Sequence, residues 1–176
     1  MTSARAFLAL LATSLACPAP GLAAAASVDP HNYIQARILA LHNRERAAVG
    51  APPLAWDPVL AAAAASYGPT LASLGRLAHS PRASRPGQRE NLAMGTAGHY
   101  GPEDLVEMWI EEKRHFRPGM FPNVSRTGRW ADVGHYTQMI WKGTTNVGCA
   151  VHVARGRNYL ICRYSPPGNA DGRSVP

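Results

Sequence analysis

The side chains able to do chemistry in this chain of 176 residues include seven histidines and 11 acidic residues, spread over distant segments. None forms a catalytic motif: G-x-S-x-G, H-E-x-x-H, G-x-G-x-x-G and C-x-x-C are all absent. Imidazoles can bind zinc and similar divalent metals, and carboxylates can orient an imidazole or a bound water. His79 and Ser80 are adjacent, but a serine nucleophile needs its base within hydrogen-bond reach. These residues therefore define a site only if the fold brings distant segments together.

The first 26 residues have the composition of a secretory signal peptide. Arg5 supplies a positive charge, residues 6–16 form an apolar run, and small residues follow as far as Ala26. We expect cleavage between Ala23 and Ala26, which leaves residues 27–176 as a single domain with a short C-terminal tail. The expected location is extracellular, or periplasmic in a Gram-negative cell. A retained membrane anchor is the alternative.

Charge and hydropathy exclude two classes of protein. The net charge is +7, but the basic residues are scattered with no run of four or more, so nucleic acid is not expected as a partner. No apolar run in the interior reaches 18 residues, so no transmembrane segment is expected in the mature chain.

Removal of the signal peptide leaves two cysteines, Cys149 and Cys162. An even number in an exported chain favours a disulfide. Both lie in strand-like segments on either side of a turn at residues 154–158, so a cross-strand bridge is reasonable if the two residues lie opposite each other. Two free thiols are the alternative.

The elements that must position these side chains are helices and strands that do not alternate. Asp29-Pro30 and Asp57-Pro58 both signal helix starts. Helices are expected at residues 30–49, 59–71 and 103–116, and a single helical turn at 137–141. Strands are expected at 147–153 and 159–164, with a short extended segment at 90–94. We expect Pro69 to kink or shorten the second helix. This order excludes a doubly wound parallel sheet and predicts an α+β fold or a three-layer sandwich.

Two long strings of residues then match the signature blocks of a known family. They are Gly134–Trp141, continuing into Val147–Ala150, and Tyr159–Asn169. Five shorter motifs precede them in the family's order: His42-Asn43-x-x-Arg46, Leu54-x-Trp56-Asp57, Ala78-His79-Ser80, Glu90-Asn91-Leu92-Ala93 and Trp109-x-x-Glu112. Over residues 34–169 the chain resembles the CAP superfamily, which comprises cysteine-rich secretory proteins, antigen 5 and pathogenesis-related class-one proteins. The resemblance implies a three-layer α-β-α sandwich.

The resemblance also implies a central cleft lined by two histidines and two glutamates. The matching positions are His79, Glu90, Glu112 and His135. The two histidines are the expected ligands of zinc or another divalent metal, and each carboxylate is expected to orient a histidine or a bound water.

Several neighbours of these four residues bear on the cleft. Ser80, Tyr136 and Gln138 flank the motif histidines and are further candidates for the cleft wall. Arg89 stands where the family usually has glycine, so a bulky charge is expected at the rim. His42 and Arg46 are expected to be structural hydrogen-bonding residues. Three tryptophans within the motifs are expected in the core: Trp56, Trp109 and Trp141.

The function implied by the resemblance is binding rather than catalysis. Family members bind sterols, fatty acids or other small lipids, and a cleft of this kind can also hold a metal. One alternative is a hydrolase of the metal-assisted or Ser/His type. Another is an extracellular structural or effector protein without a small ligand, whose partner is a cell-surface or host protein. Asn123 begins a glycosylation sequon that has meaning only in a eukaryotic secretory pathway.

Overall fold

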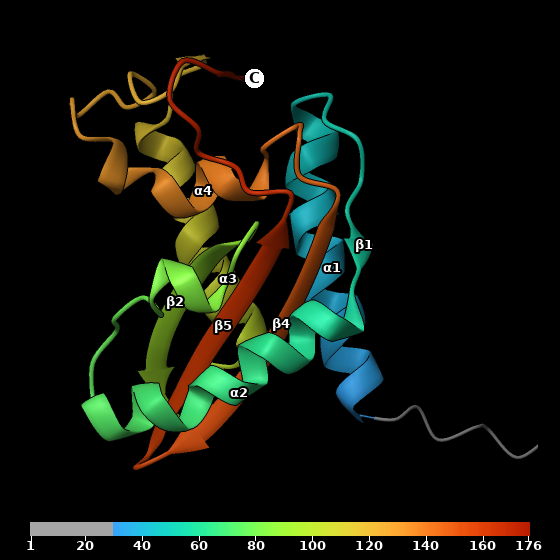
Figure 1. The fold of residues 1–176 in the computed structure, drawn as a ribbon, viewed down its shortest axis with the longest axis vertical. Helices are drawn as coiled ribbons and strands as arrows, with labels where there is room; N and C mark the ends of the chain where they lie inside the picture. Colours follow the sequence, from blue (N-terminus) through green and yellow to red (C-terminus); the bar gives the residue numbers. More distant parts are fainter. Residues whose placement is uncertain (1–29) are drawn as a thin grey trace, which may run out of the picture.

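The computed structural model describes residues 30–176, so the predicted signal peptide lies outside the described residues. Its centre is a four-stranded sheet in the order β1-β4-β5-β2 (Figure 1). The strands are β1 (Ala55–Trp56), β2 (Arg89–Thr96), β4 (Asn146–Ala154) and β5 (Arg157–Ser165). The short β1 pairs in parallel with β4, whereas the other neighbouring pairs are antiparallel.

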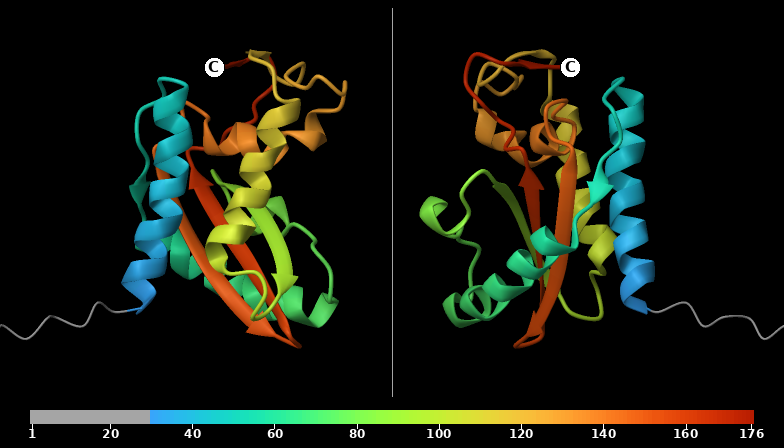
Figure 2. Two further views of the ribbon diagram at one scale, coloured as in Figure 1. Left: turned by 180° about the vertical axis from the view of Figure 1, so that it is seen from behind. Right: turned by 45° about the vertical axis from the view of Figure 1, so that its right-hand side comes forward.

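Helices cover both faces of this sheet (Figure 2). One face is covered by α2 (Pro58–Leu74), which packs on β4 and β5. The other face is covered by α1 (Pro30–Ala48) and α3 (Pro102–Glu111), which also pack against each other. The predicted three-layer α-β-α sandwich is therefore confirmed.

One end of the sandwich is built from short elements around α4 (Gly134–Met139). A two-stranded sheet pairs β3 (Gly119–Met120) with the C-terminal β6 (Ser174–Val175). The remaining turns are 3-10 helices: η1 (Arg82–Ser84), η2 (Glu112–His115) and η3 (Trp130–Asp132). A separate cluster of buried residues, including Phe116, Tyr136 and Trp141, forms the core of this end.

The second helix is longer than its sequence suggested. Asp57 caps its N-terminus by accepting from two backbone N–H groups, and Gly75 ends it in the left-handed conformation, with Pro69 inside the helix. The prediction that α2 would end near residue 71 is therefore wrong. The apolar face that contains Leu60 and Leu71 is buried on the sheet, and this burial outweighs the hydrogen bond that proline cannot donate. Gly148 of β4 allows the close approach, because a Cβ there would clash with the backbone of α2.

The hairpin of β4 and β5 confirms the predicted disulfide. Cys149 and Cys162 lie directly opposite each other in the strand register, and their sulfurs are bonded. The turn consists of Arg155 and Gly156, both with positive φ, which is the turn that joins antiparallel strands most tightly. The disulfide thus lies between two strands that the ladder already holds together.

The third helix and the short fourth helix differ from the predicted boundaries. The α-helix ends at Glu111, and the following η2 turn carries Glu112 toward α4. That carboxylate accepts hydrogen bonds from the backbone N–H groups of His135 and Tyr136, so α4 begins at Gly134 instead of Thr137. The cap comes from a distant segment, so the local sequence gives no signal for it.

No helix among residues 30–176 is long and apolar enough to cross a membrane.

Candidate metal and ligand cleft

A cavity of about 560 Å³ opens where β2 meets the end built around α4. Its wall comes from three parts of the chain: the segment from His79 through η1 into β2, the segment from β3 to α4, and the segment after β5. The residues that line it are His79, Arg82, Arg85, Arg89, Glu90, Asn91, Phe121, Pro122, Trp130, Gly134, His135, Gln138, Asn169, Ala170 and Asp171.

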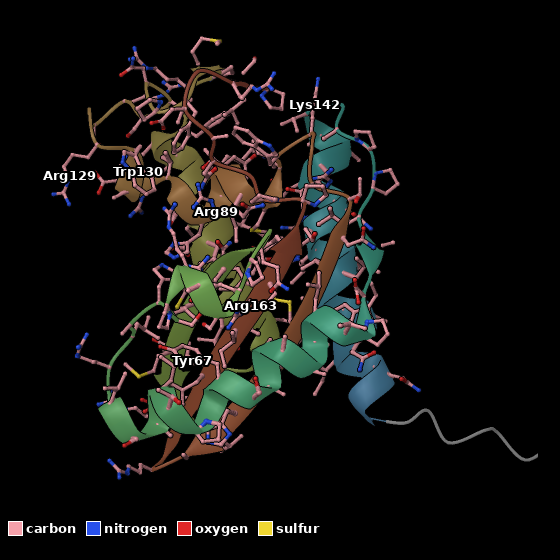
Figure 3. All side chains as sticks on the ribbon, viewed as in Figure 1. Tyr67, Arg89, Arg129, Trp130, Lys142 and Arg163 are labelled. Atoms are coloured by element: carbon pink, nitrogen blue, oxygen red, sulfur yellow. A yellow bond between two sulfur atoms is a disulfide. The ribbon has the colours of Figure 1, made fainter. Side chains whose placement is uncertain are left out.

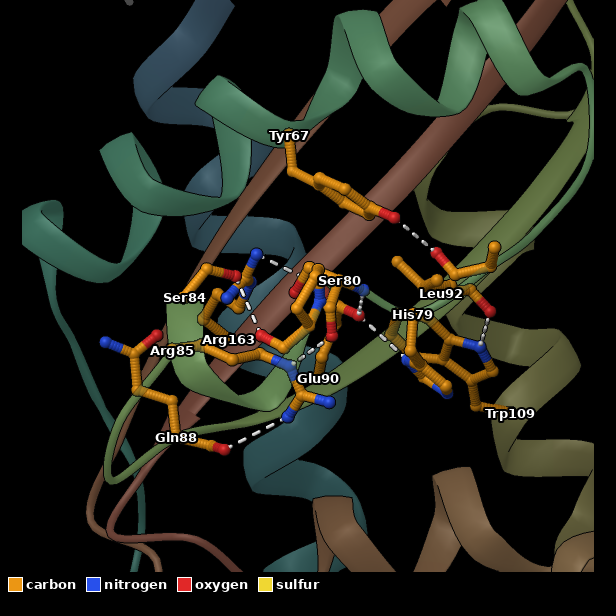
Figure 4. A network of polar contacts seen from close by, with 12 residues as sticks. Tyr67, His79, Ser80, Ser84, Arg85, Gln88, Glu90, Leu92, Trp109 and Arg163 are labelled. Carbon is orange, nitrogen blue, oxygen red and sulfur yellow. Dashed lines mark hydrogen bonds and ion pairs between the residues drawn. The ribbon is translucent and has the colours of Figure 1, made fainter.

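The first histidine of the cleft is held by a buried carboxylate (Figure 4). The Nδ1 of His79 lies 2.8 Å from Oε1 of Glu90. The same oxygen accepts from the backbone N–H of Ser80 at 3.0 Å, and the other carboxylate oxygen accepts from the Ser80 hydroxyl at 3.0 Å. A carboxylate can only accept, so Nδ1 of His79 carries the proton and Nε2 keeps its lone pair in the neutral ring.

A buried arginine balances the charge of this carboxylate. The Glu90 side chain is 0% exposed and Arg163 is 4% exposed, with Nη2 and Oε2 3.0 Å apart. Burial alone would raise the pKa of Glu90, but the hydrogen bond from His79 and the charge of Arg163 outweigh it and hold that pKa below its ordinary value. The guanidinium of Arg163 also lies 5.9 Å from the ring centroid of Tyr67 on α2. Glu90 is therefore a charged group fixed on several sides.

The second histidine has the same arrangement in a different setting. The Nδ1 of His135 lies 2.6 Å from Oε1 of Glu112, so its Nε2 is also the ring nitrogen with the free lone pair. The other oxygen of Glu112 accepts from the first N–H groups of α4, each at 3.0 Å. The imidazole of His135 stacks on Trp109, with centroids 5.8 Å apart and planes 19° apart.

A buried hydrogen-bond chain connects α1 to this second histidine. The Nδ1 of His42 donates to the carbonyl of Ile38, and its Nε2 accepts from the hydroxyl of Tyr164 at 2.8 Å. Asn91 then donates both to that hydroxyl and to the carbonyl of His135. Burial lowers the pKa of His42 to about 4, so the ring is neutral at physiological pH.

The last turn of α1 holds the segment after α4 through a buried arginine. Arg46 is 0% exposed. It donates to the carbonyls of Pro52, Met139, Trp141 and Thr144 at 2.6 to 2.9 Å. Together, His42 and Arg46 have the structural roles that their motif predicted. Trp109 and Trp141 are buried in the core as expected, and Trp56 packs partly buried against it.

The comparisons with known proteins can be set against this geometry. The family model of CAP, the Cysteine-rich secretory protein family, matches residues 39–164. A pathogenesis-related protein of PR-1 type from Sambucus nigra is 36% identical over 146 residues, which is 82% of this chain and 80% of that protein. The chain belongs to the CAP family. Pathogenesis-related protein 1A of Nicotiana tabacum is 40% identical over 136 residues, 76% of this chain and 75% of that one.

Solved structures agree on the fold of this CAP domain. The crystal structure of NaASP2 with Zn2+ superimposes with a TM-score of 0.68 at 24% identity, covering 80% of this chain and 83% of that one. At this identity the likeness bears on the fold alone.

The CAP motif residues occupy different positions around the cleft. His79, Glu90, His135 and Gln138 line the cavity, whereas Glu112 holds His135 in place. The amide of Gln138 is engaged with Thr144 and the N–H of Gly168. The other two candidates lie outside the lining: Ser80 is buried behind Glu90, and Tyr136 packs in the core beside Phe116.

The donor set of the CAP cleft fits a divalent metal in part. Two imidazoles face one cavity, each with Nδ1 bound to a carboxylate, which is the usual arrangement around a metal-binding histidine. No group of three or more His, Cys, Asp or Glu side chains that could hold a metal is found within residues 30–176. A metal here would therefore take His79 and His135 from the protein and complete its coordination with water or a ligand.

Several wall residues were not identified from the sequence. Arg89 was expected at the rim, and it lines the cavity with Nε and Nη2 donating to the carbonyls of Gly168 and Asn169. Arg82, Arg85 and Trp130 were not expected there. Arg82 and Trp130 begin the short 3-10 helices η1 and η3, and Arg85 directly follows η1. These stretches show no regular pattern in the sequence, and the only available signal was a high frequency of arginine.

Proposed function

We propose that this CAP-domain protein is an exported binding protein whose cleft binds a divalent metal through His79 and His135. One observation carries the proposal: two histidines from segments far apart in the sequence line a single cavity, each is held at Nδ1 by a glutamate, and both Nε2 atoms are unbonded among the described residues. Imidazole nitrogens suit zinc, as they suit copper, iron and nickel. Two protein ligands leave coordination positions open for a ligand.

The protein's own groups fix how those nitrogens are presented. Glu90 and Glu112 hold the two rings by Nδ1, and this raises the basicity of Nε2. Trp109 stacks on the ring of His135 and limits its rotation. When bound, the metal would supply a Lewis acid for an electron-rich ligand group.

A Ser/His hydrolase is not favoured by this geometry. Acyl transfer needs the serine hydroxyl on the imidazole. Ser80 instead donates to Glu90, and the Nδ1 of His79 donates to the same carboxylate. Both side chains therefore converge on Glu90 rather than on each other.

The test is a zinc titration of the purified protein by calorimetry, together with native mass spectrometry. We expect one zinc per chain, and loss of that binding in the double variant His79→Ala, His135→Ala. His99→Ala is the matched control, because His99 is exposed and lies outside the cavity lining. Zinc binding that persists in the double variant, or that disappears equally in the control, would rule the site out.

A second cavity favours a small lipid as a further ligand. It has a volume of about 500 Å³, and its wall combines apolar and cationic side chains: Trp141, Pro166, Pro167 and Ala170 with Lys142 and Arg173. Such a wall suits an acyl chain whose carboxylate meets the cations.

Lipid uptake is tested on delipidated protein. We expect saturable binding of a fatty acid that survives the double histidine variant and weakens several-fold in Lys142→Gln, Arg173→Gln. A sterol, which has no acidic group, should be unaffected by the charge variant. Absence of uptake at micromolar concentration would rule out the lipid. Absence of both zinc and lipid would favour a cell-surface or host protein as the partner.

A further inference from the structure

Three arginines on the wall of the cleft have no acidic partner. Arg82, Arg85 and Arg89 all line the cavity, and none lies within 4.0 Å of a carboxylate oxygen among residues 30–176. They come from η1, the residue after it and the start of β2. Arginines that line a cavity without ion pairing are available to a ligand.

Two of these guanidinium groups are already fixed by backbone carbonyls. Arg85 is 7% exposed and donates to the carbonyls of Ser80 and Gln88, each at 3.2 Å (Figure 4). Arg89 donates to the carbonyls of Gly168 and Asn169 at 2.9 and 3.0 Å. Their remaining N–H groups have no partner among the described residues. Binding of an anion here therefore costs less side-chain entropy than binding to freely rotating arginines would.

The charges around the cavity leave this wall with surplus positive charge. The negative charge of Glu90 is matched by Arg163, and Asp171 is the other carboxylate in the lining. Burial lowers the pKa of Arg89 and the charges of Arg82 and Arg85 lower it further, which outweighs the opposite effect of Asp171, so Arg89 lies close enough to both arginines to be repelled by them. A bound anion would relieve that repulsion.

An exposed aromatic ring faces the same cavity. Trp130 is 48% exposed and lines the cleft. Its ring packs against Phe121, with centroids 5.4 Å apart, and a Cβ added to Gly134 would lie 3.0 Å from it. Figure 3 shows Trp130 and Arg89 at the same end of the molecule. A fixed, exposed indole offers a flat apolar surface next to the cationic wall.

We propose that the cleft binds an acidic carbohydrate, with its carboxylates on Arg82, Arg85 and Arg89 and the apolar face of a sugar ring on Trp130. Arginine pairs with carboxylates in a bidentate manner, and a cavity of about 560 Å³ accommodates a short oligomer. A nucleotide is less suited, because the amides that could read a base are engaged within the protein: those of Asn91, Gln138 and Asn169. This ligand shares the cavity of the proposed metal site but requires neither histidine.

The first experiment compares two ligands that differ only in charge. Trigalacturonic acid and its methyl ester are titrated into the purified protein by calorimetry in the presence of EDTA. We expect the acid to bind at least tenfold more tightly than the ester, and its binding to weaken as NaCl is raised. Equal binding of acid and ester, no binding of the acid, or tighter binding of a nucleoside diphosphate would overturn the proposal.

The second experiment locates the site with variants of matched charge. Arg82→Gln removes an exposed cation from the wall and should weaken binding of the acid about tenfold. Arg155→Gln removes the same charge from the β4–β5 turn at the far end of the sheet and should have no effect. Trp130→Leu should weaken acid and ester alike. An equal loss in Arg82→Gln and Arg155→Gln would show that only net charge matters, and would overturn the site.

The double histidine variant separates this proposal from the metal site. We expect it to bind the acid normally in EDTA although it no longer binds zinc. Loss of acid binding in that variant, once its folding is confirmed by circular dichroism, would contradict an arginine site that is independent of the histidines.

Discussion

The two His–Glu pairs of the cleft make the same hydrogen bond but are supported in different ways. Glu90, which holds His79, is 0% exposed and lies against the buried Arg163. Glu112, which holds His135, is 18% exposed, and its second oxygen accepts from backbone N–H groups at the start of α4. One carboxylate is therefore balanced by a buried charge, and the other by helix amides.

Because of this difference, one carboxylate should contribute mainly to the stability of the fold and the other mainly to the position of its histidine. Removing one member of a buried ion pair leaves the other charge uncompensated, which is costly to the whole fold. Removing a carboxylate that caps a short helix mainly frees the first turn of that helix. Loss of Glu90 should therefore affect folding most, and loss of Glu112 should affect the placement of His135 most.

The largest effect is expected from Glu90→Gln. The variant keeps the shape of the side chain but leaves Arg163 buried without its counter-charge, so the free energy of unfolding should fall by about 3 to 5 kcal/mol. Urea denaturation followed by tryptophan fluorescence measures this loss. Part of it should be recovered in Glu90→Gln, Arg163→Met, which removes the stranded cation. A loss no larger than that of Glu112→Gln would contradict the comparison.

The next largest effect is a dependence of stability on pH, in which His42 and Glu90 should act over different pH ranges. The pKa of His42 falls from 6.5 to about 4 on folding, so the unfolded chain binds its proton first as pH drops. The free energy of unfolding should decrease by about 1.4 kcal/mol for each pH unit between pH 6.5 and 4, which amounts to roughly 3 kcal/mol in total.

The contribution of Glu90 has a different pH range. Its pKa is lowered by folding, so its contribution is present above the unfolded value of 4.5 and is lost as pH falls through the lower folded value. Denaturation curves at a series of pH values should show two separate slopes. The upper slope should disappear in His42→Gln and persist in Glu90→Gln; the reverse result would show that the groups were assigned incorrectly.

A smaller change in stability and a larger change in zinc affinity are expected from Glu112→Gln. An amide oxygen can still accept one N–H of α4, so unfolding should cost about 1 to 2 kcal/mol less than in the parent. The amide no longer holds Nδ1 of His135 as a charged acceptor, and zinc affinity should fall about tenfold or more. Calorimetric titration with zinc measures the affinity of the parent and of the variant. Unchanged zinc affinity would mean that His135 does not depend on this carboxylate.

The smallest effect is expected from Ser80→Ala. The hydroxyl makes one of several hydrogen bonds to Glu90, so the variant should lose about 1 kcal/mol of stability and keep its zinc affinity. It also tests the hydrolase alternative directly. If the parent cleaves any ester or peptide and Ser80→Ala abolishes that cleavage, the structural role assigned to Ser80 is wrong.

Most of the fold and part of the cleft could be predicted from the sequence. Helix starts at Asp29-Pro30 and Asp57-Pro58, and the strands around the cysteines, follow from local preferences, so they could be predicted. The start of α4 could not, because its cap is a carboxylate that lies 23 residues away in the chain from His135. The motif identified both histidines and both glutamates, but not which of the neighbouring residues reach the cavity.

The neighbours of the motif histidines show the same limit. Tyr136 is the direct neighbour of His135 and Gln138 is three residues away, yet Tyr136 packs in the core and Gln138 lines the cavity. On a short helix, adjacent residues face different directions, so the helix must be placed before their roles can be told apart. Arg82, Arg85 and Trp130 lie in or directly after 3-10 helices of three residues, which are too short to show a periodicity that predicts where a side chain lies.

The four carbonyls bound by Arg46 have a consequence for local opening of the molecule. Three of them belong to residues 139–144, which are 93 to 98 residues away along the chain. The C-terminal end of α4, the helix that carries His135, is thereby joined to the first helix of the domain. Its amide hydrogens should exchange with solvent together with those of α1, as one cooperative unit. The two halves of the cleft, His79 on one side and His135 on the other, are in turn joined by the hydrogen bond from Asn91 of β2 to the carbonyl of His135.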